Sequence, residues 1–219
     1  MIPKIIHFIW LGGNVLPPLE KKCIATWEKY NPEFTIIKWD ESNVNIDLPI
    51  YHKAYKEKKW AFCADIIRLK VLLEYGGIYL DTDMEIIKSL EPLLNQSCFL
   101  GKEDSKNISA GIIGCTKGHS YIKDCFNELI IALQKDYIPI PQILTYVYTK
   151  NNYNSVKIYD YQYFYPYNPF QNDIKQLLFQ DIVEETYSIH HWSYSWKPSI
   201  YSRIINKLKK TFSKNKYRN

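Results

Sequence analysis

The sequence predicts a single α/β domain in which helices flank a mixed β-sheet. Short apolar runs of strand length recur along the chain, and apolar residues at helical spacing lie between several of them. With 219 residues, 46% of them hydrophobic, the chain can bury one substantial core. Only 23% of the residues are charged, so the composition does not favour disorder. No internal repeat or low-complexity linker divides residues 1–199, which we assign to one domain.

The first half of the chain alternates predicted strands and helices. Strands are expected at 4–10 and 35–39, and helices at 17–30, 49–59 and 60–75. Gly12 and Gly13 end the first strand in a loop. In α/β folds, a loop at the carboxyl end of a parallel strand lies where ligands bind. This loop is therefore a candidate wall of a binding site.

The second half is expected to continue the sheet. Strands are predicted at 78–81, 84–88, 97–100, 110–115 and 188–192, and helices begin near 118 and 138. The polar segment 101–109 lies between two of these strands and could form one edge of a substrate site. Residues 151–170 are rich in tyrosine, which suits either a sugar-binding surface or an amphipathic strand at the edge of the sheet.

Residues 78–83, with the sequence Ile-Tyr-Leu-Asp-Thr-Asp, carry the strongest chemical signal. In a continuing strand Asp81 and Asp83 would share a face, whereas a turn at Thr82 would bring both carboxylates together at the strand end. Two anionic oxygen ligands suit magnesium or manganese bound with water and phosphates. An isolated Asp-x-Asp is, however, more often a solvated turn.

The helix before this strand carries a second polar pair. Its apolar residues lie at 61, 62, 66, 69, 72 and 73, and Gly76 or Gly77 provides its left-handed end. Asp65 and Arg68 are three residues apart and therefore project from one helix face. They could form a structural ion pair or the charged lip of a pocket for a polar ligand.

These motifs together resemble glycosyltransferase family 32, whose members carry a DXD sugar-binding region and are distantly related to the large clostridial glucosylating toxins. The resemblance rests on ADIIR at 64–68 with YGGIYLDTD at 75–83, on IPKIIHFIWLG at 2–12, and on HHWSYSW at 190–196. It spans roughly residues 2 to 196. It implies a Rossmann-like fold of the GT-A type and a metal-dependent transferase that retains anomeric configuration.

The resemblance also implies roles for individual residues. Asp65, Arg68 and Asp81 would be the catalytic residues that hold the transferred sugar, and Trp10 would stack on the base of the nucleotide. Asp81 and Asp83 would bind the metal, and Asp83 also belongs to the residues that contact the donor.

A late histidine is expected to complete the metal site. Adjacent histidines on a strand point to opposite sides, so at most one of His190 and His191 faces the metal. Counting back from Trp196 favours His191. Ser195 and Trp196 would close over the diphosphate of the donor.

The expected cofactor is a divalent metal, with manganese preferred over magnesium, and the expected donor is a UDP-linked hexose. GDP-linked mannose is an alternative donor, since the family uses several. Ile140-Pro141-Gln142 stands where relatives often have Gly-Pro, which leaves the donor contacts of this segment open. The sequence shows no convincing carboxylate nucleophile, which favours attack by the acceptor on the face that the diphosphate leaves.

The acceptor is expected to be a glycan, a lipid-linked sugar or a protein, as in the assembly of bacterial surface polysaccharides, glycolipids or glycoproteins. A nucleotide-sugar hydrolase and a non-catalytic carbohydrate-binding protein are the alternatives. Nucleic acid is not expected as a partner, because outside residues 203–219 the chain carries 21 basic and 23 acidic residues and no nucleic-acid-binding motif.

The location of the protein is expected to be cytoplasmic. The five cysteines contain no Cys-x-x-Cys pair, and several lie in apolar runs, as is typical of buried free thiols in a reducing compartment. No signal peptide is visible, and no apolar run reaches the roughly 20 residues of a membrane span.

Residues 200–219 form a separate basic segment. Ile200, Ile204, Leu208 and Phe212 recur every four residues, with lysines and arginines between them. This pattern predicts an amphipathic helix that binds the anionic inner face of the plasma membrane, or else one that docks on the domain through its apolar stripe.

Overall fold

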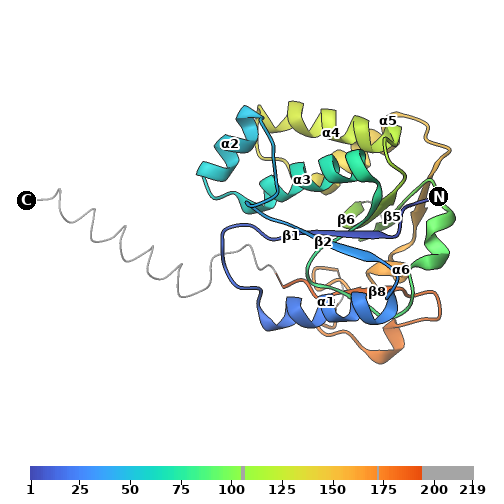
Figure 1. Ribbon diagram of the computed structural model, residues 1–219. Helices are drawn as coiled ribbons and strands as arrows, with labels where there is room; N and C mark the ends of the chain where they lie inside the picture. The colour runs from blue at the N-terminus through green and yellow to red at the C-terminus, as the bar shows by residue number, and fades with distance from the viewer. Residues whose placement is uncertain (105–106, 172, 194–219) are drawn as a thin grey trace, which may run out of the picture.

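The computed structural model describes residues 1–104, 107–171 and 173–193. Its centre is a six-stranded sheet with the strand order β2-β1-β3-β6-β5-β7 (Figure 1). The strands are β1 (Ile5–Ile9), β2 (Thr35–Trp39), β3 (Gly77–Leu80), β5 (Cys98–Lys102), β6 (Ile108–Cys115) and β7 (Val156–Tyr159). Strand β6 is antiparallel to both of its neighbours, and the other pairings are parallel. The predicted mixed sheet is thus confirmed.

Two layers cover the sheet (Figure 1). One face carries α2 (Pro49–Lys56), α3 (Trp60–Tyr75), α4 (Ser120–Leu133) and α5 (Ile140–Lys150). The other carries α1 (Pro18–Tyr30), the short α6 (Tyr161–Phe164) and a two-stranded antiparallel sheet of β4 (Met84–Ile86) and β8 (Ser188–His190). Short 3₁₀ helices lie at Glu91–Asn95 and Phe179–Asp181.

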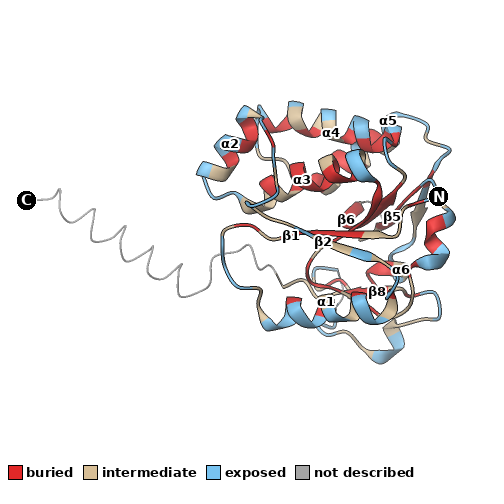
Figure 2. Ribbon diagram, viewed as in Figure 1, coloured by how far each residue is buried: buried red, intermediate tan, exposed pale blue. Residues whose placement is uncertain are grey.

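Each face of the sheet packs on its own apolar core, and buried residues line both faces in Figure 2. Strand β3 shows how the sequence supplies both cores, because side chains alternate along a strand. Ile78 and Leu80 pack with Trp27 of α1, whereas Tyr79 packs in the layer of α3. All four residues of β3 are buried, which explains the unbroken apolar run before Asp81.

The fold brings three chain segments together at one edge of the sheet. The chain leaves β1 for β2 on one side, and β3 lies on the other side of β1. Ligands of open α/β sheets bind at such a reversal of strand order, outside the carboxyl ends of the strands. Because β6 is antiparallel, its first half reaches the same edge, where the Asp81 amide donates to the Gly111 carbonyl at 2.8 Å.

Most of the expected elements are present, with one informative difference. The predicted strand at 84–88 does not join the main sheet but pairs with β8, more than one hundred residues later in the chain. Part of the tyrosine-rich segment forms the edge strand β7, as one of its two interpretations expected, and the part after it forms the helix α6. The helix over 60–75 ends at Gly76 as predicted, with φ of 68°.

The expected state of the cysteines is confirmed, since all five are buried and free. Within the described part of the chain, no helix combines the length and the apolarity needed to cross a membrane.

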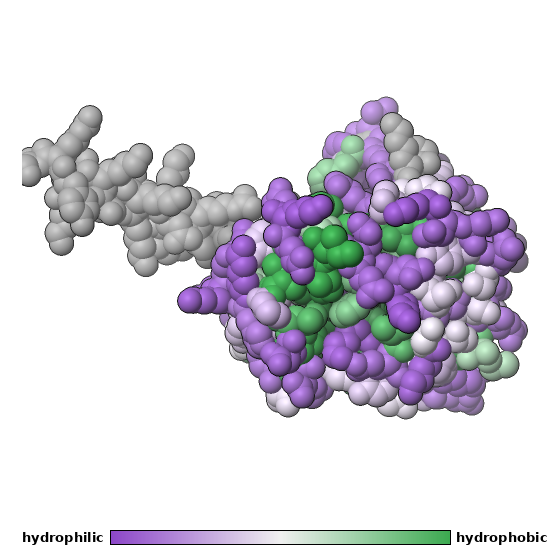
Figure 3. Space-filling model, turned by 90° about the horizontal axis from the view of Figure 1, so that it is seen from above, coloured by the Kyte–Doolittle hydropathy of each residue, from purple (hydrophilic) through white to green (hydrophobic). Residues whose placement is uncertain are grey.

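On the face of the molecule seen from above, a group of hydrophobic residues is surrounded by hydrophilic ones (Figure 3). Ile131 of α4, on the face of the sheet that carries α2, α3, α4 and α5, is half-exposed. The expected helix at 200–219 and its boundary lie outside the described residues.

Candidate functional site

A cavity of about 420 Å³ opens at the carboxyl ends of β1 and β3. This volume is within the range of small-molecule sites, which lies between about 300 and 1,000 Å³. Its apolar wall includes Trp10, Leu11, Trp60, Phe62, Pro139 and Pro141. Its polar residues include Asp65, Arg68, Asp81, Asp83, Glu103, Ser109 and His190. Apolar surface with a few convergent polar groups is the usual composition of a ligand site.

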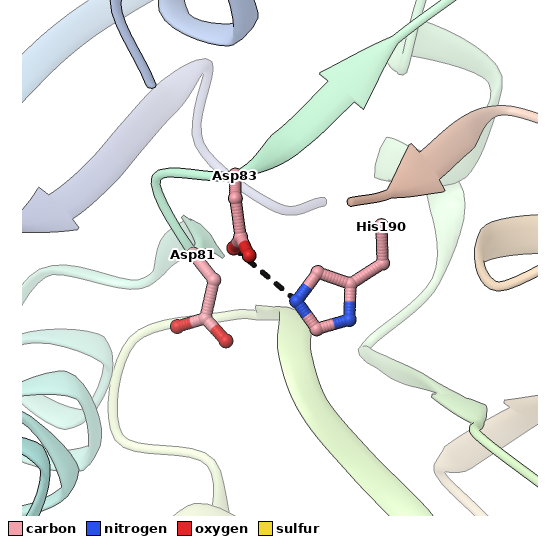
Figure 4. Close-up of side chains that lie close together, drawn as sticks. All are labelled: Asp81, Asp83 and His190. Atoms are coloured by element: carbon pink, nitrogen blue, oxygen red, sulfur yellow. Dashed lines mark hydrogen bonds and ion pairs between the residues drawn. The ribbon is translucent and has the colours of Figure 1, made fainter. Parts of the chain in front are cut away.

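Two aspartates and one histidine converge in this cavity (Figure 4). The Met84 amide donates to the Asp81 carbonyl at 3.0 Å and closes the predicted turn at Thr82, so both carboxylates lie at the strand end. The antiparallel pairing of β4 with β8 places His190 opposite Met84. As a result, one ligand atom each from Asp81, Asp83 and His190 lie within 4.8 Å of one another.

The expectation that His191 faces the aspartates is wrong, and His190 takes that place. His190 Nε2 lies 3.2 Å from Asp83 Oδ1, whereas His191 Nε2 lies 2.8 Å from Glu85 Oε2. The two side chains point to opposite sides because they are neighbours at the end of a strand. Which of them faces the site depends on the register between β4 and β8, and counting back from Trp196 does not report that register.

The environment of Asp83 keeps its carboxylate charged. Burial would raise its pKa, but the hydrogen bond from His190, the charge of that ring and the Ser193 amide lower the pKa to about 2. The Ser193 amide donates to Asp83 Oδ2 at 2.8 Å. Burial lowers the pKa of His190, but Asp83 and the neighbouring carboxylates outweigh this and raise it.

The donor atoms at this position fit a divalent cation. Two carboxylates and one imidazole are ligands that manganese accepts, and magnesium prefers oxygen ligands with water. His190 Nδ1 is buried and makes no hydrogen bond to the described residues, while the ring packs against Trp192, with 4.1 Å between the ring centres. A cation would take the place of the proton that His190 shares with Asp83.

A second charged cluster comes from α3. Arg68 Nη2 lies 3.1 Å from Asp65 Oδ1 and 3.3 Å from Asp81 Oδ1. Its Nη1 donates to the Ala110 carbonyl at 2.7 Å, and its guanidinium lies 4.4 Å from the centre of the Tyr79 ring. The two interpretations of this pair therefore hold together, since Asp65 and Arg68 form an ion pair and also line the cavity.

Burial and the mutual charges of this cluster shift the pKa values of Asp65 and Arg68. Burial raises the pKa of Asp65 to about 7, because Arg68 offsets only part of the cost and Asp81 adds a repulsive charge. Burial alone would lower the pKa of Arg68, but Asp81, Tyr79 and Asp65 raise it. Arg68 therefore remains a permanent positive charge in the cavity.

Of the remaining predicted residues, some line the cavity, some lie elsewhere, and two lie outside the described part of the chain. Trp10 lines the cavity, and its Nε1 donates to the Asn14 carbonyl at 2.6 Å, which fixes the ring. Ser195 and Trp196 lie outside the described residues. The tyrosines of 151–170 do not line this cavity.

The segment 101–109, expected at a substrate edge, contributes Glu103 and Ser109 to the cavity. Neither residue was singled out by sequence, because only the antiparallel course of β6 brings them to this edge.

The fold is that of the GT-A glycosyltransferases. The glycosyltransferase PaToxG superposes with a TM-score of 0.58 at 21% identity, over 68% of this chain and 69% of that one. The galactosyltransferase LgtC, solved with donor and acceptor sugar analogues, superposes with a TM-score of 0.52 at 14% identity, over 94% of both chains. At these identities the likeness shows the fold.

The sequence comparisons define the family. Residues 17–100 match the glycosyltransferase sugar-binding region containing the DXD motif. The chain is 31% identical to an uncharacterized glycosyltransferase of Acanthamoeba polyphaga mimivirus, over 99% of this chain and 90% of the viral protein. The chain therefore belongs to this DXD-containing glycosyltransferase family, and Asp81-Thr82-Asp83 is its DXD sequence.

Two fungal relatives are longer proteins. Inositol phosphoceramide mannosyltransferase 3 of Schizosaccharomyces pombe is 30% identical over 58% of this chain and 37% of its own length. A mannosyl phosphorylinositol ceramide synthase of Saccharomyces cerevisiae is 29% identical over 66% of this chain and 39% of its own length. The chain thus spans about two fifths of these fungal relatives.

Proposed function

We propose that the chain transfers a hexose from a nucleotide-sugar to an acceptor hydroxyl, with a divalent cation held by Asp81, Asp83 and His190. The observation that carries this proposal is the convergence of those three side chains beside Arg68 in one cavity. A nucleoside diphosphate leaves readily only when its growing negative charge is stabilised. A bound divalent cation, with manganese preferred over magnesium, supplies that stabilisation by Lewis-acid chemistry.

The chain's own residues would orient the donor. Arg68 can donate to sugar hydroxyls and to phosphate oxygens, while Asp65 and Asp81 can accept from hydroxyls. Trp10 offers an aromatic face to the base, for which uridine is our first choice. We expect the acceptor hydroxyl to attack from the face that the diphosphate leaves, with retention of anomeric configuration.

The names of the fungal relatives support one further donor and one class of acceptor. The fungal proteins are named for mannose transfer to inositol phosphoceramide, so GDP-linked mannose is the second donor to test, and a lipid-linked polyol is a candidate acceptor. Glycan and protein acceptors, as in bacterial surface polysaccharide or glycoprotein assembly, are the other candidates.

A cytoplasmic location at the inner face of the plasma membrane would suit a lipid-linked acceptor, with the basic residues of 200–219 attracted to anionic lipids. Flotation of the chain with anionic liposomes, with and without residues 200–219, tests this part. Equal flotation of the two chains would refute it.

A donor screen by thermal shift tests the proposed function. A ligand that binds only the folded chain stabilises it, so the matching donor should raise Tm. We expect a rise with manganese and a UDP-hexose or GDP-mannose together, and a smaller one with either alone. Independent effects of metal and nucleotide would favour a carbohydrate-binding protein instead. Product analysis with and without acceptor separates a transferase from a nucleotide-sugar hydrolase.

A further inference from the structure

Glu103 is a carboxylate of the cavity that neither the cation site nor the Arg68 cluster uses. It directly follows β5 (Cys98–Lys102) and projects into the cavity. Its amide donates to the Asn107 carbonyl at 3.1 Å, and its own carbonyl accepts from Asn168 Nδ2 at 3.2 Å. The backbone of Glu103 is thus held on both sides, so its side chain starts from a fixed position.

The charge environment of Glu103 differs from that of the other cavity carboxylates. Asp65 and Asp81 both pair with Arg68, and Asp83 pairs with His190. Within the described part of the chain, Glu103 has no ion pair with a basic side chain. It is also absent from the group of side chains that converge as metal ligands. Its carboxylate already has one neutral donor in Ser109 and can accept from further neutral donors.

The surroundings of Glu103 favour a hydroxyl group as a further donor. Burial and the charges of Asp104 and Asp81 raise the pKa of Glu103, while a hydrogen bond from the Ser109 side chain and the charge of His190 lower it in part. A partly buried carboxylate without a cation is stabilised when hydroxyl groups donate to it. A hydroxyl suits this position better than a phosphate group, because Glu103, Asp104 and Asp81 would repel a further negative charge.

We propose that Glu103 binds a substrate hydroxyl, carried either by the acceptor or by the transferred sugar. This inference rests on the proposed function and adds a specificity-determining residue to it. Glu103 enters the cavity from the β5–β6 connection, whereas Asp65 and Arg68 enter from α3. The two walls would thus hold different parts of the substrates.

The test is Glu103→Gln in the full chain, with Glu33→Gln as the matched control. Glutamine keeps the size of the side chain but removes the charge that strengthens a hydrogen bond from a hydroxyl. The loss of a hydrogen bond to a charged group corresponds to about a ten-fold or greater fall in kcat/KM for transfer. Glu33 is exposed and pairs with Lys4, so its variant should match the wild type.

Three measurements separate this role from a structural one. Tm, and the affinity for manganese with UDP, should stay unchanged in Glu103→Gln, because Glu103 contacts neither by this proposal. A fall in transfer with unchanged acceptor-free donor hydrolysis would assign the hydroxyl to the acceptor. A fall in both reactions would assign it to the transferred sugar.

The inference is overturned if Glu103→Gln folds and keeps wild-type kcat/KM in both reactions. Glu103→Asp restores the charge on a shorter side chain and should recover part of the lost activity; no recovery together with a lowered Tm would show a structural role. A wild-type chain that turns over no donor would refute the proposed function, and with it this inference. That outcome is recognised before any Glu103 variant is measured.

Discussion

The two charged clusters of the cavity each hold a buried aspartate, and the pKa values of these two aspartates are shifted in opposite directions. On the α3 side, Arg68 serves two carboxylates, and burial raises the pKa of Asp65 to about 7. On the β4–β8 side, Asp83 has an imidazole and the Ser193 amide to itself, and its pKa falls to about 2. The difference lies in the number of donors for each carboxylate, since both aspartates are buried.

This comparison indicates what each side can bind. A guanidinium stays protonated, so the α3 side carries its own cation at all times. An imidazole can lose its proton and become a metal ligand, so the β4–β8 side can exchange a proton for a metal. One side is suited to hydroxyl and phosphate oxygens, and the other to a divalent cation.

Asp83→Asn should have the largest effect. Asparagine can still accept from the Ser193 amide, so the fold should persist, but the charged ligand is lost. We expect turnover to fall by about a hundred-fold or more, the loss seen when a group that stabilises transition-state charge is removed. Steady-state rates at increasing manganese measure this, with chelator-treated wild type as the reference. Metal-dependent turnover at the wild-type rate would show that Asp83 is not a ligand.

His190→Ala and His191→Ala form the next test. Loss of a partner outside the ligand shell commonly costs ten- to one hundred-fold in metal affinity, so loss of a direct ligand should cost about one hundred-fold. We expect His190→Ala to show this loss in a manganese titration and His191→Ala, whose ring contacts Glu85 instead, to bind manganese like the wild type. The reverse order would restore His191 as the ligand.

Arg68→Ala should follow, with Arg68→Lys as its control. Removing the guanidinium leaves Asp65 and Asp81 without their shared partner, so both sugar positioning and stability should suffer. We expect kcat to fall about ten-fold or more, while the affinity for UDP with manganese changes little. Lysine keeps the charge but cannot reproduce the planar contacts, so it should restore stability more than kcat. An effect confined to nucleotide affinity would place Arg68 near the diphosphate instead.

Asp65→Asn should have the smallest effect, visible in the pH dependence of stability. The folded pKa of about 7 lies above the ordinary value of 3.8, so the folded chain holds this proton more tightly than the unfolded chain. The contribution of Asp65 to stability is therefore complete below about pH 4 and is lost as pH rises toward 7. Relative to wild type, Asp65→Asn should gain a few degrees in Tm between pH 4 and 8. A constant difference in Tm across this range would contradict the raised pKa.

The local parts of the fold and site could be predicted from sequence. The helix that carries Asp65 and Arg68, its end at Gly76 and the turn at Thr82 follow from apolar spacing, a glycine and turn chemistry within a few residues. These features predicted Asp65 and Arg68 on the helix, and Asp81 and Asp83 at the end of the strand that follows it. Trp10 followed from its position at the end of the first strand.

The parts that depend on distant contacts could not be predicted in this way. His190 faces the aspartates only because β8 pairs with β4 in one register, and a shift by one residue would exchange it with His191. Glu103 and Ser109 reach the cavity only because β6 is antiparallel to β3 and β5. The apolar pattern of β8 is the same in either register, and that of β6 is the same whether the strand runs parallel or antiparallel to its neighbours.

Ser193, the last described residue, contacts both Asp83 of the cation site and the first helix. Its amide donates to Asp83 Oδ2 at 2.8 Å, and its hydroxyl donates to Glu20 Oε1 of α1 at 2.9 Å. A deletion that begins at Ser193 would keep Asp81, Asp83 and His190, yet it would remove a hydrogen-bond donor from Asp83 and a contact from the first helix. A weaker manganese affinity after this deletion would follow because Asp83 loses the hydrogen bond that holds its carboxylate in place.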